Sequence, residues 1–217
     1  MKKLFLSFLF TSFSLLVFSQ QNAFRPEWSF GMNGGSTLSR IRFTPRVSQE
    51  YLIQYHVGAT ARYISEEHFG IQAELNYSLR GWKDLTDDVF LNEYDRSLVY
   101  LELPLMTHLY FDLSKRVRFL FLAGPQIAYL LDEKWNLTLN DPEENIGYYD
   151  LPVQRKFDYG IVLGGGLEFR TGVGSFVLDG RYYFGLSDIF SNTRADIFSA
   201  SSNQVIGINL TYLTKFH

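Results

Sequence analysis

Residues 69–80 read Phe-Gly-Ile-Gln-Ala-Glu-Leu-Asn-Tyr-Ser-Leu-Arg, and this stretch decides the fold. Apolar side chains occupy every second position from Phe69 to Leu79, whereas the positions from Gly70 to Arg80 hold polar residues or glycine. A period of two places these two sets on opposite faces of a β-strand, while a helix would mix them on every face. The stretch therefore predicts a strand with one apolar and one polar face.

The same alternation recurs along the rest of the chain. It predicts strands at residues 28–39, 53–63, 69–80, 99–111, 117–131, 157–170, 176–184 and 206–216, of which 117–131 is apolar on both faces in places. These segments exceed the usual strand length of about five or six residues, and no helical segment separates them. Eight strands in such a series predict an all-β fold, an eight-stranded antiparallel up-and-down transmembrane β-barrel.

The connections between the predicted strands are of two kinds, which alternate. Short turns lie at 65–68, 112–116 and 171–175, and longer polar segments lie at 40–50, 81–97, 132–156 and 187–203. Short turns at one rim and long loops at the other are typical of bacterial outer-membrane barrels. We therefore expect the short turns and both termini on the periplasmic side.

Alternation alone does not decide which face points inward. A soluble, secreted lipocalin-like barrel that binds an apolar ligand has its apolar face inside, whereas a membrane barrel has it outside. Gly160, Gly164 and Gly166 on one polar face leave room for large polar-face residues such as Arg181 and Tyr183, as a side-chain-filled interior requires. Aromatic residues gather near the ends of the apolar faces, as in the two girdles of a membrane barrel. Both observations favour an apolar exterior.

Charges of both signs lie on the polar face, and a buried lumen needs such pairing. The predicted lumen network consists of Arg62, Glu74, Arg80, Glu102, His108, Asp158, Glu168, Arg170, Asp179 and Arg181. If the strands beside the 171–175 turn pair tightly, Glu168 and Asp179 should lie near each other. Arg170 and Arg181 would then sit diagonally and relieve the repulsion. We expect a polar plug that fills the barrel; the alternative is a narrow proton or ion path or a coupling element, because eight strands enclose no general aqueous pore.

Two prolines lie inside predicted strands. Pro104 and Pro125 each remove one ladder hydrogen bond, and a closed barrel has no edge strand to accommodate the loss. The sequence therefore predicts a bulge or a local irregularity at each of them.

The first residues have the pattern of a secretory signal peptide. Lys2 and Lys3 precede an apolar run, and Val17 and Ser19 are small enough for the cleavage positions. A run of about fifteen residues is shorter than the roughly twenty that a membrane-spanning helix needs. The predicted organisation is a signal peptide at 1–19 and an outer-membrane barrel domain at 20–217.

Composition removes several classes of function. The chain has 217 residues, no cysteine and a formal net charge of −3. The lack of cysteine excludes disulfides, lipoprotein lipidation and Cys-ligated zinc, and the small net charge argues against nucleic-acid binding. The histidines at 56, 68, 108 and 217 show no metal-ligand spacing, and the glycines at 164–166 precede no helix that would make a phosphate loop. We expect neither a metal nor a cofactor.

The long loops are the candidate interaction surface. The first is basic, and the next two are acidic; the residues are Arg40, Arg42 and Arg46, then Asp84, Asp87, Asp88, Glu93 and Asp95, then Asp132, Glu133, Asp141, Glu143, Glu144 and Asp150. We expect a structural or interaction role through these loops or as a subunit of an envelope assembly. The expected partners are outer-membrane lipid and lipopolysaccharide, the barrel assembly machinery and an envelope protein.

The alternative function is an enzyme that modifies outer-membrane lipid. His56 and His108 fall on the polar face, and outer-membrane lipid hydrolases use histidine and serine near a barrel rim. No Ser/His/acid spacing stands out, so no residue is predicted to be catalytic.

Several short segments together resemble a known family. They are Tyr-Leu-Glu-Leu-Pro-Leu at 100–105, Ala-Gly-Pro at 123–125 followed by Tyr129, Phe-Asp-Tyr-Gly at 157–160, Gly-Gly-Gly-Leu-Glu-Phe at 164–169, and Arg-Tyr-Tyr at 181–183 followed by Gly-Leu-Ser-Asp-Ile at 185–189. Over nearly the whole mature chain they resemble the PorT-like outer-membrane β-barrel family of Bacteroidetes. That resemblance implies an outer-membrane barrel of mostly unassigned function. The family's namesake belongs to a gliding- and protease-linked secretion system, and its distinguishing segments are absent from this sequence.

Overall fold

The computed structural model describes residues 25–84, 93–138, 151–190 and 199–216. The predicted signal peptide at 1–19 lies outside these residues. So do several acidic loop residues, namely Asp87, Asp88, Asp141, Glu143, Glu144 and Asp150. Among the described residues, no helix is long and apolar enough to cross a membrane.

The described chain is built from β-strands. Their bounds are β1 Glu27–Thr44, β2 Gln49–Glu50, β3 Leu52–Glu66, β4 Phe69–Asp84, β5 Glu93–Asp112, β6 Val117–Thr138, β7 Phe157–Thr171, β8 Gly174–Gly185 and β9 Ala200–Phe216. Strand β2 is a two-residue piece that pairs only with the end of β4. The other eight strands correspond to the eight predicted from the alternation.

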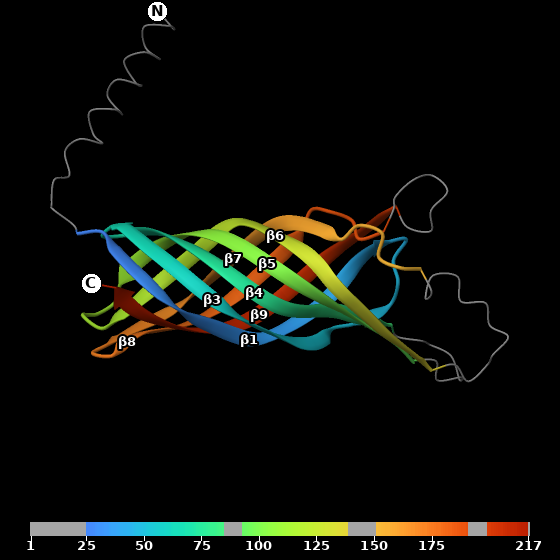
Figure 1. The fold of residues 1–217 in the computed structure, drawn as a ribbon, viewed down its shortest axis with the longest axis horizontal. Coiled ribbons are helices and arrows are strands. Elements are labelled where there is room, and N and C mark those ends of the chain that lie inside the picture. Colours follow the sequence, from blue (N-terminus) through green and yellow to red (C-terminus); the bar gives the residue numbers. More distant parts are fainter. Residues whose placement is uncertain (1–24, 85–92, 139–150, 191–198, 217) are drawn as a thin grey trace, which may run out of the picture.

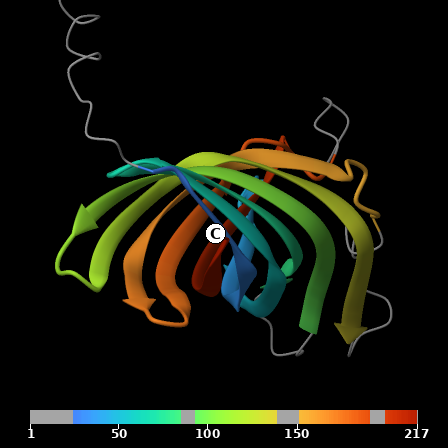
Figure 2. The same cartoon turned by 60° about the vertical axis from the view of Figure 1, so that its left-hand side comes forward.

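These eight strands form a closed ring. Each pairs antiparallel with its neighbours in the chain, and β1 pairs with β9 from Trp28↔Phe216 to Thr44↔Ala200. Figure 1 shows the short β3–β4, β5–β6 and β7–β8 turns at one end, together with the start of β1 and the end of β9. The predicted up-and-down barrel is confirmed, and Figure 2 shows its curved wall from a second direction.

Several strands run further toward the loop end than the alternation predicts. Strand β5 begins at Glu93, and β6 continues to Thr138, so parts of the predicted loops 81–97 and 132–156 are strand. The hydrogen-bond ladder pairs backbone groups whatever the side chains are, whereas alternation is required only where one face meets lipid. Beyond the apolar band, the strands therefore continue to pair although their side chains no longer alternate between apolar and polar.

The ladder is irregular at both strand prolines, as predicted. The β4–β5 pairing skips Pro104 and Leu103, and the β5–β6 pairing skips the positions at Pro125 and its neighbour Gly124. The register on either side of each gap is unchanged, so neither gap is a bulge. A true register shift lies elsewhere on β5, at Val99.

The apolar face of the barrel points outward. Met32 and Ile53 are 68% and 61% exposed, whereas Arg62 is 1% exposed. Outward aromatic residues contact one another near the turns, where the Trp28 and Tyr63 ring centroids are 4.7 Å apart and those of Phe176 and Tyr212 are 5.1 Å apart. This arrangement suits a lipid-facing exterior. It also rules out the lipocalin-like alternative, which needs the apolar face inside.

Candidate functional site

The lumen contains two apolar clusters as well as the predicted polar network. The cluster toward the turns consists of Ile64, Met106, Tyr110, Leu120, Leu122, Val162, Val177 and Leu213. The cluster toward the loops consists of Ile41, Phe43, Trp82, Tyr94, Leu98, Tyr100, Ala128, Leu130, Val153, Ile189 and Phe190. The expectation of a polar plug that fills the barrel is therefore wrong for the two ends of the lumen, which are apolar. The signal was present in residues 117–131, which are apolar on both faces because β6 supplies inward leucines to both clusters.

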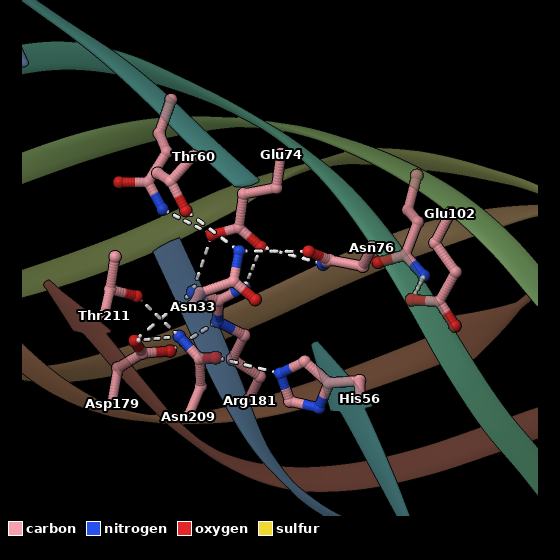
Figure 3. A network of polar contacts seen from close by, with 12 residues as sticks. Asn33, His56, Thr60, Glu74, Asn76, Glu102, Asp179, Arg181, Asn209 and Thr211 are labelled. Atoms are coloured by element: carbon pink, nitrogen blue, oxygen red, sulfur yellow. Dashed lines mark hydrogen bonds and ion pairs between the residues drawn. The ribbon is translucent and has the colours of Figure 1, made fainter. Parts of the chain in front are cut away.

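An ion pair crosses the full width of the barrel between Glu74 and Arg181. Arg181 Nη1 and Nη2 donate to Glu74 Oε2 and Oε1 at 2.8 and 3.0 Å, and its Nε donates to Asp179. Glu74 lies on β4 and Arg181 on β8, and four steps around the ring separate these strands in either direction. Figure 3 shows Glu74 and Arg181 pointing toward each other from separate parts of the wall.

A second ion pair crosses the lumen in the same way. Arg62 on β3 donates to Glu168 on β7 at 3.2 Å, and these strands also lie opposite each other in the ring. Gln72 joins the two pairs, because its side chain accepts from Arg62 Nε at 2.8 Å and donates to Glu74. The barrel walls are thus tied across the interior by charge-assisted hydrogen bonds.

Arg80 forms the third centre of the network. Its guanidinium lies 3.1 Å from Asp158 and 2.8 Å from Glu102, over the rings of Tyr183 and Tyr100 at 4.4 and 5.2 Å. Three arginines thus serve five carboxylates, and neutral side chains also donate to four of them, namely Glu74, Glu102, Asp158 and Asp179. The neutral donors are Gln72, Asn76, Gln126, Ser187, Asn203 and Asn209.

The sequence-predicted residues are mostly placed in this interior. Arg62, Glu74, Arg80, Glu102, His108, Asp158, Glu168 and Asp179 are buried, and Arg181 is partly buried. His108 is fully buried, and its Nδ1 lies 3.3 Å from the Tyr110 hydroxyl group. Arg170 is partly buried beside the β7–β8 turn, opposite Ser175, and has no ion pair within the described chain.

In the expected arrangement around Glu168 and Asp179, the part assigned to Arg170 is wrong. Glu168 lies opposite Val177, and Asp179 lies opposite Gly166, so the two carboxylates are offset along the strands. Each has its own arginine, Arg62 or Arg181, and needs no diagonal Arg170. The length of the β7–β8 turn, two residues, sets this register. The sequence did not reveal the register because it did not define the length of the turn.

Three glycines on β7 leave the space that the large side chains of β8 fill. A Cβ atom on Gly160 would lie 2.8 Å from the Tyr183 ring, and one on Gly164 would lie 3.1 Å from Arg181 Cγ. A Cβ atom on Gly166 would lie 2.6 Å from Asp179 Cβ. A Cβ atom at each of the three positions would also lie 2.2–2.6 Å from a backbone oxygen of β8, and real Cβ atoms essentially never approach within 3.0 Å. Glycine at these positions therefore allows β8 to lie close to β7 with its charges pointing into the lumen.

The amides and hydroxyl groups of the network were missed in the sequence. Asn33 donates to Thr60 and Asn76, and Asn209 donates to Asp179 and Thr211 (Figure 3). All of them occupy inward positions of the same alternation that identified the charges. The alternation could therefore have indicated that these residues point inward. It does not show which inward polar residues form hydrogen bonds in the network and which only fill space.

A cavity of about 50 Å³ lies within the network. Its lining includes His56, Ser78, Arg80, Glu102 and Asn209. His56 Nε2 lies 2.8 Å from Asn209 Oδ1, and its Nδ1 is buried without a hydrogen-bond partner in the described chain. At roughly 10–15 Å³ of such volume for each water molecule, the cavity has room for about three to five.

The loop-end mouth is closed by chain segments that fold into it. The amides of Gln154 and Arg155 donate to Ile189 O at 3.2 and 3.1 Å, and Phe190 is 1% exposed. Arg96 ties these segments to the wall, because it donates to Leu151 O at 2.8 Å and to Glu133 at 2.7 Å. Its guanidinium also lies between 5.3 and 5.7 Å from the rings of Trp82, Trp135 and Phe190.

Comparison with known proteins agrees with this geometry. The model of a family described as "Outer membrane protein beta-barrel domain" matches residues 18–191. The chain belongs to this family. As an outer membrane beta-barrel domain, the protein is located in the outer membrane and crosses it with its strands.

Solved outer-membrane barrels are among the structures similar to this chain, and OprG has a similar fold. OprG of Pseudomonas aeruginosa is 11% identical with a TM-score of 0.52, over 88% of this chain and 96% of that one. Neisserial surface protein A is 11% identical with a TM-score of 0.45 (86% and 97%), and Ail of Yersinia pestis is 13% identical with a TM-score of 0.39 (87% and 99%). No curated protein matches the sequence.

Proposed function

We propose that this outer-membrane barrel is closed to solutes, is not an enzyme, and acts through its loop-end surface in a structural or interaction role. The observation that carries the proposal is the filled lumen, with an apolar cluster toward each end and ion pairs across the middle. A partner therefore meets this protein at the rim and not inside it. The proposed partner is an envelope protein, to which the barrel contributes as one subunit of an assembly.

The filled lumen argues against the ion-path alternative. An ion would have to pass Leu120, Leu122 and Met106, each of which is 0% exposed. It would also have to separate Arg62 from Glu168 or Arg181 from Glu74, and breaking one buried pair costs about 3–5 kcal/mol. In a planar bilayer we expect no step conductance from the reconstituted protein, and regular channel steps would refute the closed barrel.

The surroundings of His56 and His108 argue against the enzyme alternative. His56 lies directly opposite Ser78 on the β3–β4 ladder, which is the pairing that a hydrolase would need. However, both line a cavity of about 50 Å³ below the closed mouth, which is too small for a lipid acyl chain. Substituting His56 and His108 with alanine should leave the lipid A profile of the cell unchanged. A changed lipid A profile would support the lipid-modifying enzyme and contradict the proposal.

The interaction role can be tested by site-specific photo-crosslinking in intact cells. A photoreactive residue at Trp135 or Leu186, which are 43% and 52% exposed near the loops, should capture an envelope protein. The matched control is Val173, which is 73% exposed in the β7–β8 turn at the opposite rim. Capture at Val173 alone, or at none of the three positions, would contradict the proposal.

We also propose that the protein belongs to the PorT-like group and is inserted by the barrel assembly machinery. The family proposal rests on the segments at 100–105 and 164–169. Gly166, in the segment at 164–169, leaves the space that Asp179 occupies. The assembly proposal rests on β9, the strand that closes the ring, which ends on Phe216 next to Trp28 of β1. When the assembly machinery is depleted, the chain should remain unfolded, and its heat-modifiable gel shift should be lost.

A further inference from the structure

Two arginines on the outward face of β1 lack a carboxylate partner within the described chain. Arg40 Nε donates to Gln204 Oε1 at 3.0 Å, and the Arg42 guanidinium lies over an aromatic ring. An ion pair with a carboxylate holds most other strand arginines, namely Arg62, Arg80, Arg96, Arg118 and Arg181. The outer wall of the barrel therefore carries two positive charges that no carboxylate of the described residues neutralises.

Both guanidinium groups lie over aromatic rings. The Arg40 Cζ atom is 4.9 Å from the centroid of the Tyr51 ring, and Arg42 Cζ is 5.1 Å from that of Phe184. A cation–π contact uses the face of the guanidinium and leaves the N–H groups at its edge available. The rings thus hold the two groups against the wall with donors free for an anion.

The register of three strands places these arginines at the border of the lipid-facing surface. Leu38, Ile206 and Tyr182 lie side by side on β1, β9 and β8, and each is 38–42% exposed. The next outward positions toward the loops are Arg40, Gln204 and Phe184, which form the adjacent row. Two residues along a strand span about 7 Å, so the row that contains Arg40 lies at headgroup depth.

The outer leaflet of this membrane presents phosphate at that depth. Lipopolysaccharide carries phosphate groups on lipid A, directly outside its acyl chains. A guanidinium group matches phosphate through paired N–H donors, and such charge-assisted hydrogen bonds are the strong ones. The acyl chains of the same molecule would lie against the apolar row that contains Leu38 and Ile206.

We propose that Arg40 and Arg42 form a binding site for the lipid A phosphates of lipopolysaccharide on the outer wall of β1. Gln204 positions Arg40, and Tyr51 and Phe184 hold the two guanidinium groups. Arg40 and Arg42 were predicted in the loop at 40–50, but they lie on β1. This site on the strand wall is separate from the loop-end partner surface, so its test is independent of the proposed interaction role.

The test is a titration of the detergent-solubilised full chain with lipopolysaccharide, followed by native mass spectrometry. The double variant Arg40→Gln/Arg42→Gln should bind lipopolysaccharide at least about tenfold more weakly than the unchanged protein. The matched control is Lys115→Gln/Arg116→Gln, which removes two exposed charges at the turn rim and should bind like the unchanged protein. A heat-modifiable gel shift checks that each variant is folded, and the single variant Arg42→Gln should give an intermediate loss.

Further arms of the experiment identify the source of the phosphate. Dephosphorylated lipopolysaccharide should bind the unchanged protein as weakly as the double variant binds the native lipid, and inorganic phosphate alone should not compete. Equal binding of the double variant and the unchanged protein would overturn the proposal. So would equal binding of the dephosphorylated lipid, displacement by inorganic phosphate, or equally tight binding of phosphatidylglycerol.

Discussion

Glu74 and Arg181 face each other from opposite walls of the barrel and form a bidentate ion pair, with N···O distances of 2.8 and 3.0 Å. Glu74 is 2% exposed, and Gln72 and Asn76 donate to its remaining lone pairs. The pair joins strands that share no backbone hydrogen bond, so it resists distortions of the ring that the ladder alone permits. It is the centre of the proposed closed lumen.

Removing Arg181 should destabilise the barrel more than removing the charge of Glu74. Arg181→Met leaves both Glu74 and Asp179 unpaired and should lower the free energy of unfolding by about 3–5 kcal/mol. Glu74→Gln should cost less, because Arg181 keeps Asp179. Urea unfolding in lipid vesicles, followed by tryptophan fluorescence, measures both. Equal losses would show that the two carboxylates do not share this arginine.

Substitution of Arg96 should open the loop-end mouth. Arg96→Ala removes the hydrogen bond to Leu151 O and the ion pair with Glu133. Because a lost charged hydrogen bond is worth about 1.5–3 kcal/mol, hydrogen exchange at the Gln154 and Arg155 amides should accelerate at least about tenfold. The control is Arg118→Ala, whose partner Asp112 lies at the turn end. Unchanged exchange in Arg96→Ala would mean that other contacts hold the mouth closed.

A charge on the lipid-facing wall should be costly in proportion to its depth. Leu103, in the middle of the outward face of β5, is 45% exposed, and Leu103→Arg should cost about 2–4 kcal/mol. Leu113, which is 64% exposed in the β5–β6 turn, lies beyond the lipid, and Leu113→Arg should cost about 0–1 kcal/mol. Unfolding in vesicles gives both values, and similar costs at the two positions would contradict the proposed membrane band.

The inward glycines of β7 should not tolerate a methyl group. In Gly164→Ala the new Cβ atom would lie 2.6 Å from Leu122 Cδ1 and 3.1 Å from Arg181 Cγ, so we expect a loss of about 1–3 kcal/mol. Gly180 is an outward glycine on β8 whose nearest atom would be 4.0 Å away, and Gly180→Ala should be nearly neutral. Thermal or urea unfolding distinguishes the two. A neutral Gly164→Ala would show that β8 can move away from β7.

Most of the architecture was predictable from the sequence, because a period of two appears wherever one strand face meets lipid and the other does not. The stretch from Phe69 to Arg80 shows it without exception. The same parity also picked the inward charges, including Arg62, Arg80 and Asp158. It did not identify Gln72 or Asn209 as part of the network, because the alternation does not distinguish a neutral amide on the polar face from any other polar residue.

The alternation determined that this protein has eight strands with one apolar and one polar face, and the glycines, aromatic residues and paired charges on these faces indicated an apolar exterior. Only the tertiary structure decided which charges pair and what closes the ends. The closure of β1 on β9 places β4 opposite β8, so Glu74 meets Arg181 although 107 positions separate them in the chain. Pairing of this kind depends on ring closure and on turn length, and both are long-range properties that a local pattern of side chains does not contain.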